Sequence, residues 1–95
     1  MLSQEPIDLS KIKEGESDKE ILRLGIIAEL DAINLYEQLA AKTKNKKIKT
    51  VLLDIAKEEK THVGEFETLL LEFDKEQSEE LEKGKQEVQE LENEK

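Results

Sequence analysis

The sequence lacks cysteine and has one proline, four glycines and three aromatic residues among its 95 residues. The absence of cysteine excludes disulfide scaffolds, thiolate zinc sites and cysteine nucleophiles. Long apolar runs are missing too, since the longest stretch without a polar side chain is Leu24–Ala28; neither a secretory signal nor a membrane span is expected. With 36% hydrophobic residues, one small domain fills only a thin core, and we expect help from another chain.

Acidic residues outnumber basic ones, 24 against 15, which gives a net charge of -9. This excess argues against nucleic acid as a partner, because phosphate recognition needs clustered cations. Residues 74–95 carry nine of the acids and four lysines, or -5 of the total. The local exception is a run of five lysines, which we interpret as a solvated hairpin tip rather than an anion site. These are Lys42, Lys44, Lys46, Lys47 and Lys49.

The positions of proline and glycine predict an all-α fold of two long antiparallel helices and a short C-terminal helix. Ser17 and Glu20 have the spacing of a capping box, so the first helix is expected from about Asp18. Residues 42–45 form the predicted turn, the second helix follows over 46–73, and Asp74 is a fresh N-cap for a helix to about Leu91. The predicted organisation is therefore a flexible segment 1–16, a hairpin 17–73 and an acidic helix and tail 74–95.

Each long helix carries polar side chains within its predicted core stripe. The first stripe comprises Leu22, Ile26, Glu29, Ile33, Tyr36 and Ala40, and the second Leu52, Ile55, Glu59, His62, Phe66 and Leu69. Inward carboxylates need a compensating cation, and neither stripe contains Lys or Arg, so a metal ion is the natural candidate.

The depths of Glu29, Glu59 and His62 along the hairpin agree. In an antiparallel hairpin they lie about 15, 15 and 18 residues from the centre of the turn, within one helical turn of each other. Spacing by three lets Glu59 and His62 converge on one ion. Tyr36 lies one to two turns nearer the tip, where it could donate a hydrogen bond to a ligand or shape access.

The Glu-x-x-His pair alone is weak evidence in a chain so rich in Glu, and the argument rests on all three residues together. One Glu and one Glu-x-x-His make half of a ferritin-like dinuclear site. Two hairpins related by a two-fold axis would supply the other half and complete the core. Four carboxylates and two imidazoles suit iron or manganese better than structural zinc.

Two segments, Glu29–Tyr36 and Glu58–His62, resemble the metal-binding signatures of the encapsulated ferritins, relatives of ferritin and rubrerythrin. The resemblance covers about residues 18–90. It implies a homodimeric four-helix bundle with a di-iron ferroxidase centre, two iron ions per dimer, and assembly into a ring of ten chains. Manganese, zinc or calcium are possible substitutes for iron.

By this resemblance Glu29, Glu59 and His62 match metal ligands and Tyr36 matches a tyrosine beside the centre. Members of the family oxidise Fe(II) with oxygen and deliver Fe(III) into an encapsulin shell, so a cytoplasmic location inside a nanocompartment is expected. Asp31 is the candidate for an outer site where metal first binds, although Ala28 replaces the acid found there in some members.

Further differences concern Leu35, which stands where some members have tryptophan, and the region after Leu91, where no hydrophobic shell-targeting tail is evident. Some relatives are joined to the shell protein as an N-terminal domain. Two other functions stay open: a metal-independent helical dimerisation module, and a rubrerythrin-like peroxidase that uses the same metals.

Overall fold

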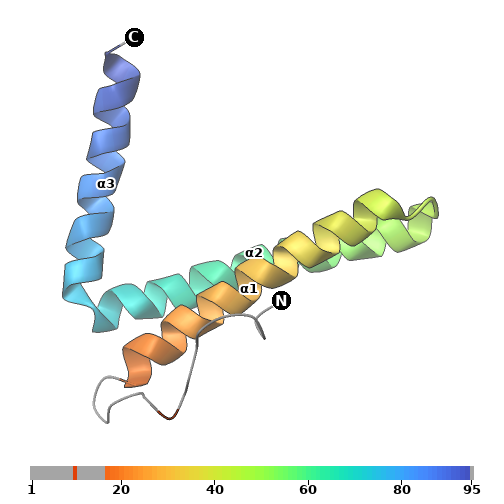
Figure 1. Cartoon of the computed structure of the whole chain (residues 1–95), viewed down its shortest axis with the longest axis horizontal. Coiled ribbons are helices and arrows are strands. Elements are labelled where there is room, and N and C mark those ends of the chain that lie inside the picture. The colour runs from red at the N-terminus through yellow and green to blue at the C-terminus, as the bar shows by residue number, and fades with distance from the viewer. Residues whose placement is uncertain (1–9, 11–16, 95) are drawn as a thin grey trace.

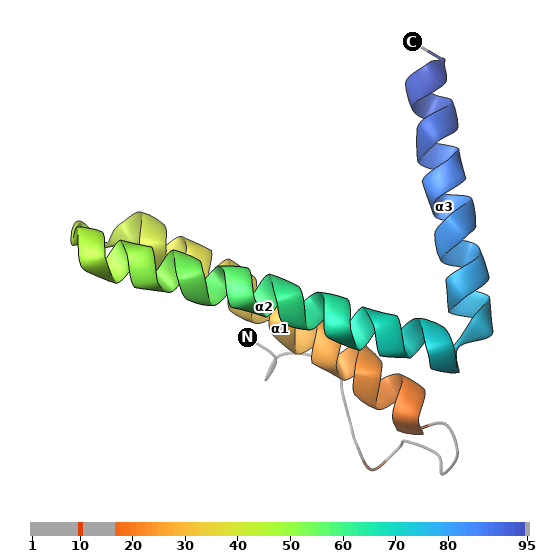
Figure 2. The same ribbon diagram turned by 180° about the vertical axis from the view of Figure 1, so that it is seen from behind.

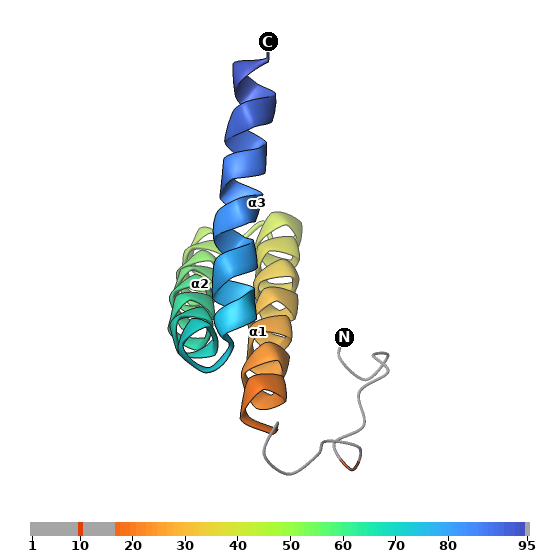
Figure 3. The ribbon, with the colours of Figure 1, turned by 90° about the vertical axis from the view of Figure 1, so that its left-hand side faces the viewer.

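The structure is a computed structural model that describes residue 10 and residues 17–94. Its elements are α1 (Ser17–Lys42), α2 (Lys46–Phe73) and α3 (Lys75–Asn93), with no strand among the described residues. Helices α1 and α2 lie side by side as an antiparallel hairpin, and α3 leaves its open end at a steep angle (Figures 1 and 3). The predicted all-α fold is therefore confirmed.

The helix boundaries follow the capping residues of the sequence. Asn45 accepts a hydrogen bond from the backbone N–H of Ile48 at 3.0 Å and starts α2. Asp74 starts α3 as predicted, and that helix runs two residues beyond the expected Leu91. Helix α1 begins at Ser17, the predicted capping residue, one residue before the predicted Asp18. Apart from residue 10, the predicted flexible segment 1–16 lies outside the described residues.

The core of the described chain is thin, as the composition suggests. Five apolar residues are buried: Leu22, Ile33, Ala40, Ala56 and Leu70. Eleven large hydrophobic residues are instead exposed, although none of the described helices has the length and apolar character to cross a membrane. Exposed apolar area on this scale marks an interaction surface.

One predicted core position is wrong. Leu69 is 43% exposed, whereas the next residue, Leu70, is 5% exposed and packs inside the hairpin. A stripe with alternating spacings of three and four follows a period of 3.5, and in a straight helix of period 3.6 it turns by about 20° per seven residues. Between Leu52 and Leu69 the predicted stripe therefore rotates away from the side of α2 that faces α1, and Leu70 takes the buried position in place of Leu69.

The elbow between α2 and α3 depends on Asp74, the one buried charged residue among those described. Its carboxylate accepts from the backbone N–H of Gln77 at 3.1 Å and from the Arg23 guanidinium of α1 at 2.7 Å. These contacts cap α3 and join it to the start of α1, so they set the direction in which α3 leaves the hairpin (Figure 2).

We expect acid to release the elbow. The Gln77 N–H, the Arg23 guanidinium and the positive charge of Lys19 lower the pKa of Asp74 below its ordinary value of 3.8, against an opposing effect of burial. The stabilisation is therefore present above the unfolded pKa and is lost as pH falls from about 4 through the folded pKa.

The measurement uses the cysteine-free chain, labelled for energy transfer at Thr50→Cys and Gln86→Cys and diluted with unlabelled chain. The distance distribution should broaden below about pH 4 in wild type, and the Asp74→Asn variant should already be broadened at pH 7. Identical titrations for both chains would contradict this role of Asp74.

Candidate metal centre

Glu29 of α1 meets Glu59 and His62 of α2 near the middle of the hairpin. Each offers one ligand atom, and the three atoms lie within 4.8 Å of one another. Nδ1 of His62 lies 3.2 Å from Oε2 of Glu29 and 3.6 Å from Oε2 of Glu59. The equal depths inferred from the turn are therefore what the structure shows.

The cluster is shielded unevenly. The side chains of Glu29 and Glu59 are 19% and 20% exposed, whereas that of His62 is 44% exposed. The two carboxylates thus sit between the helices and the imidazole lies at the rim, so the cluster opens to solvent on the side of His62. A carboxylate only accepts hydrogen bonds, so without metal the imidazole N–H is the donor to Glu29.

The donor set fits a divalent metal ion. Two carboxylate oxygens and one imidazole nitrogen are hard and borderline ligands of the kind that bind iron, manganese or zinc. No Lys or Arg side chain pairs with Glu29 or Glu59 among the described ion pairs, so the half-buried carboxylates have only the imidazole nearby to offset their charge. Three protein ligands leave open positions in the coordination shell of a bound ion.

The two other predicted site residues lie outside this cluster. Tyr36 is half-buried on α1 and makes no side-chain hydrogen bond to the three ligands within the described chain. Asp31 is half-buried as well and belongs to no group of three potential ligands in that part of the molecule. Both roles stay predictions.

A close helix contact beside the cluster was missed by the sequence analysis. A Cβ added to Gly25 would lie 3.0 Å from the ring of Phe66. Gly25 precedes Glu29 by one helical turn and Phe66 follows His62 by one turn, so the ring rests on the α1 backbone directly below the cluster. Gly25 is the only glycine between Ser17 and Lys42, and its position within a long helix was the sequence signal for a close helix contact.

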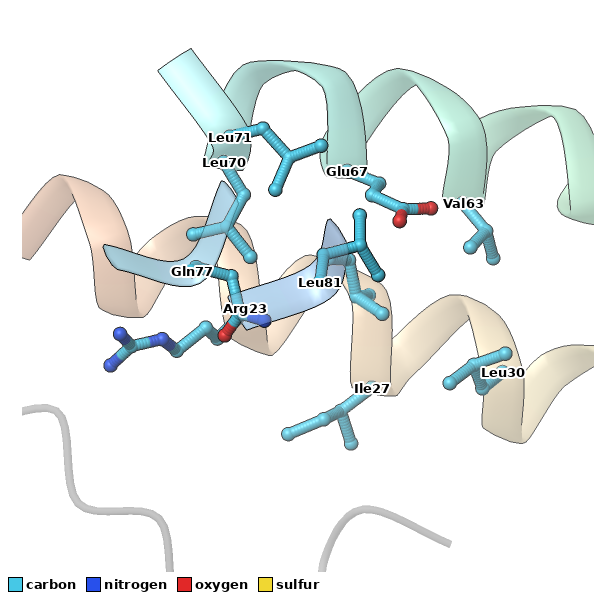
Figure 4. A pocket seen from close by; sticks show the side chains of 10 residues that line it. Arg23, Ile27, Leu30, Val63, Glu67, Leu70, Leu71, Gln77 and Leu81 are labelled. Carbon is cyan, nitrogen blue, oxygen red and sulfur yellow. The ribbon is translucent and has the colours of Figure 1, made fainter. Parts of the chain in front are cut away.

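A separate groove lies at the elbow and does not include the cluster. It has a volume of about 520 Å³ and is mainly apolar. Figure 4 shows Ile27 and Leu30 of α1, Leu70 and Leu71 of α2 and Leu81 of α3 around it. By helical periodicity the groove occupies one side of the hairpin and His62 the other.

The chain is similar to several known proteins. Residues 20–95 match the family described as rubrerythrin. A ferritin-like-encapsulin shell fusion protein of Pyrococcus furiosus is 53% identical over 93 residues, which cover 96% of this chain and 27% of that protein. The encapsulin nanocompartment cargo protein EncC of Myxococcus xanthus is 42% identical over 57 residues, 60% of this chain and 44% of that protein. The chain thus spans about a quarter of the first relative's length and less than half of the second's.

The fold is shared with a solved structure. The crystal structure of the encapsulated ferritin domain from Pyrococcus furiosus matches with a TM-score of 0.80 and 53% identity, covering 94% of this chain and 89% of that one. The shared fold, together with a Glu on one helix and a Glu-x-x-His on the other, defines the chain as a ferritin-like protein. Within that class, the chain belongs to the encapsulated ferritins and to the rubrerythrin family.

Removing one carboxylate from the cluster should affect the melting temperature differently in the metal-free and the metal-loaded chain. In Glu59→Gln, loss of a carboxylate next to Glu29 should leave the metal-free melting temperature unchanged or raised, because a repulsion disappears. The rise in melting temperature caused by Mn(II) or Co(II) should be lost, because binding to the native state is weakened. Glu58→Gln, at the exposed neighbouring position, is the control and should keep that rise. A Glu59→Gln chain that retained it would contradict the ligand assignment.

The close contact of Gly25 with Phe66 should make the effects of Gly25→Ala and Phe66→Ala on the free energy of unfolding non-additive. Gly25→Ala gains up to about 1 kcal/mol of helix propensity but forces the ring of Phe66 to move. We expect urea unfolding to show that Gly25→Ala destabilises the wild-type chain and stabilises a Phe66→Ala chain. Equal changes in both backgrounds would show that the close contact has no energetic effect.

Proposed function

We propose that the chain is a ferroxidase whose di-iron site forms between two copies, each supplying Glu29, Glu59 and His62. The observation that carries this proposal is the convergence of the three ligand atoms within 4.8 Å. One chain supplies half of the ferritin-like set of four Glu and two His. A homodimer completes it.

The surface around His62 supports pairing with a second copy. By periodicity, α1 and α2 each carry a second apolar stripe on the side where the cluster opens. We name this surface the His62 face, and its exposed apolar residues are Ile21, Leu39, Val51, Leu69 and Phe73. A partner would bury this face and remove water from around the ligands.

The charge of the paired site suits two divalent ions. Four carboxylates balance four positive charges, and the neutral imidazoles add nitrogen ligands without changing the sum. Iron is the proposed ion, two per dimer, and manganese, zinc or calcium could occupy the same oxygen-rich site. When bound, the iron pair supplies the redox chemistry, in which Fe(II) is oxidised to Fe(III) and oxygen accepts the electrons.

The side chains hold and screen the ions. Glu29 and Glu59 bind them, and His62 must lose its Nδ1 proton to serve as a ligand at that atom. Ile33 and the half-buried Phe66 keep part of the surround apolar. In this proposal Tyr36 shapes the approach to the centre, and Asp31 remains the candidate for an outer metal site.

The names of the relatives support a role in an encapsulin compartment. One is a ferritin-like protein fused to an encapsulin shell and another is an encapsulin cargo protein. We therefore propose that oxidised iron is delivered into an encapsulin shell in the cytoplasm, and that the dimers assemble into a ring of ten chains.

The rubrerythrin family match favours one second candidate, a peroxidase that uses the same metal pair. Stopped-flow reoxidation of the ferrous protein separates the two. Faster reaction with hydrogen peroxide than with oxygen would favour the peroxidase, and the reverse would favour the ferroxidase. A metal-independent dimerisation module would instead keep the same oligomer with and without chelator and would oxidise no iron.

Fe(II) oxidation is the direct test. Anaerobic Fe(II) is added, air is admitted and ferric absorbance is followed. Glu29→Ala and His62→Ala should fall to near the rate in buffer, because each change removes two ligands from a paired site. Glu58→Ala should retain the wild-type rate. Unchanged oxidation in His62→Ala would exclude the proposed centre.

A further inference from the structure

We propose that, in the homodimer with antiparallel hairpins, Lys47 at each hairpin tip lies against Glu72 of the partner subunit and that this contact fixes the register of the two chains. This inference rests on the paired site proposed above. It adds the charged contacts that hold the two chains in this register.

The first observation is the order of residues along the His62 face of α2. Lys47, Val51, Ile55, His62, Leu69 and Phe73 are spaced by four or seven residues and share one side of the helix. The middle of this stripe is apolar apart from His62. The end at the tip is basic, and the end at the elbow carries Glu72, three residues after Leu69.

The second observation is the depth of the metal cluster. A two-fold axis that brings two copies of Glu59 and His62 together crosses α2 near residue 60. If α2 then packs antiparallel on α2 of the second copy, residues whose numbers sum to about 120 lie opposite each other. Val51 is thereby placed opposite Leu69, and Lys47 beside Glu72. By the same rule Lys47 lies opposite Phe73, so its ammonium group extends past that ring to the neighbouring Glu72 of the partner subunit, and the apolar match on this stripe is that of Val51 with Leu69.

The other two-fold orientation is electrostatically unfavourable. An axis along the hairpin would place both tips at the same end, and the tip contains five lysines and no acid from Lys42 to Lys49. The antiparallel orientation separates the tips, because the tip and the elbow lie at opposite ends of the hairpin (Figures 1 and 2). Like-charge contacts across an interface are penalised, and complementary ones fix its register.

Lys47 and Glu72 are available for this contact. Both are exposed, and neither belongs to an ion pair among the residues that the structure describes. Within one hairpin they are separated by 25 residues along α2, or about 37 Å. Any energetic coupling between them must therefore act between chains.

A charge swap tests the proposal on the full metal-free chain. Lys47→Glu and Glu72→Lys should each weaken the dimer by about tenfold or more at low ionic strength, because each variant turns two attractions per dimer into repulsions. The double variant K47E/E72K restores both pairs with exchanged signs and should regain wild-type affinity. Sedimentation velocity over a concentration series gives the dissociation constants, and circular dichroism checks that helicity is kept.

Lys49→Glu is the matched control, because it makes the same change in net charge on another side of α2. It should weaken the dimer less than Lys47→Glu, and the combination K49E/E72K should show no rescue. Absence of rescue in K47E/E72K, or an equal effect of the control, would overturn the antiparallel contact. The dissociation constants are measured without iron. A failure of the charge swap would therefore contradict only the Lys47–Glu72 contact, whereas a failure of the ferroxidase proposal would appear as absent Fe(II) oxidation in the wild-type chain.

Discussion

The structure is organised around two half-buried carboxylates that lie close together and form no ion pair with a Lys or Arg side chain among the described residues. Glu29 and Glu59 lie on different helices at equal depth, and His62 approaches both through one nitrogen. Such an arrangement is costly for folding alone, since each carboxylate raises the cost of burying the other. A bound cation would remove that cost, so the residues that weaken the metal-free hairpin are the same ones that would bind the metal in the proposed centre.

The same feature explains the thin core. A chain that completed its own core would bury the His62 face and close the cluster to a second set of ligands. Instead Val51, Leu69 and Phe73 remain exposed beside the opening. In the proposed homodimer one further chain supplies both the missing apolar cover and the missing ligands, and the distribution of charge from tip to elbow selects how that chain approaches. In this proposal folding, assembly and metal binding all depend on one surface.

Much of the fold could be predicted because it depends on local signals. The side chain of Asp74 caps α3 through a backbone N–H only three residues away, so this helix start is visible in the sequence. Residues 42–45 contain no apolar residue, which marks the turn between the two long helices. The approach of Glu29 to Glu59 was also predictable, because equal distance from a short turn fixes equal depth. The direction of α3 was not, since it depends on Arg23, 51 residues from Asp74. The exchange of Leu69 for Leu70 in the core was missed for a different reason, because a small angular drift per turn accumulates along a long helix.

The central claim is that two chains together bind a pair of metal ions. Anomalous scattering at the iron edge from crystals of the full chain loaded with Fe(II) tests it most directly. We expect two peaks between a pair of hairpins, related by their two-fold axis, each in contact with Glu29, Glu59 and His62 side chains. A single ion held within one hairpin, or iron bound away from these residues, would contradict it.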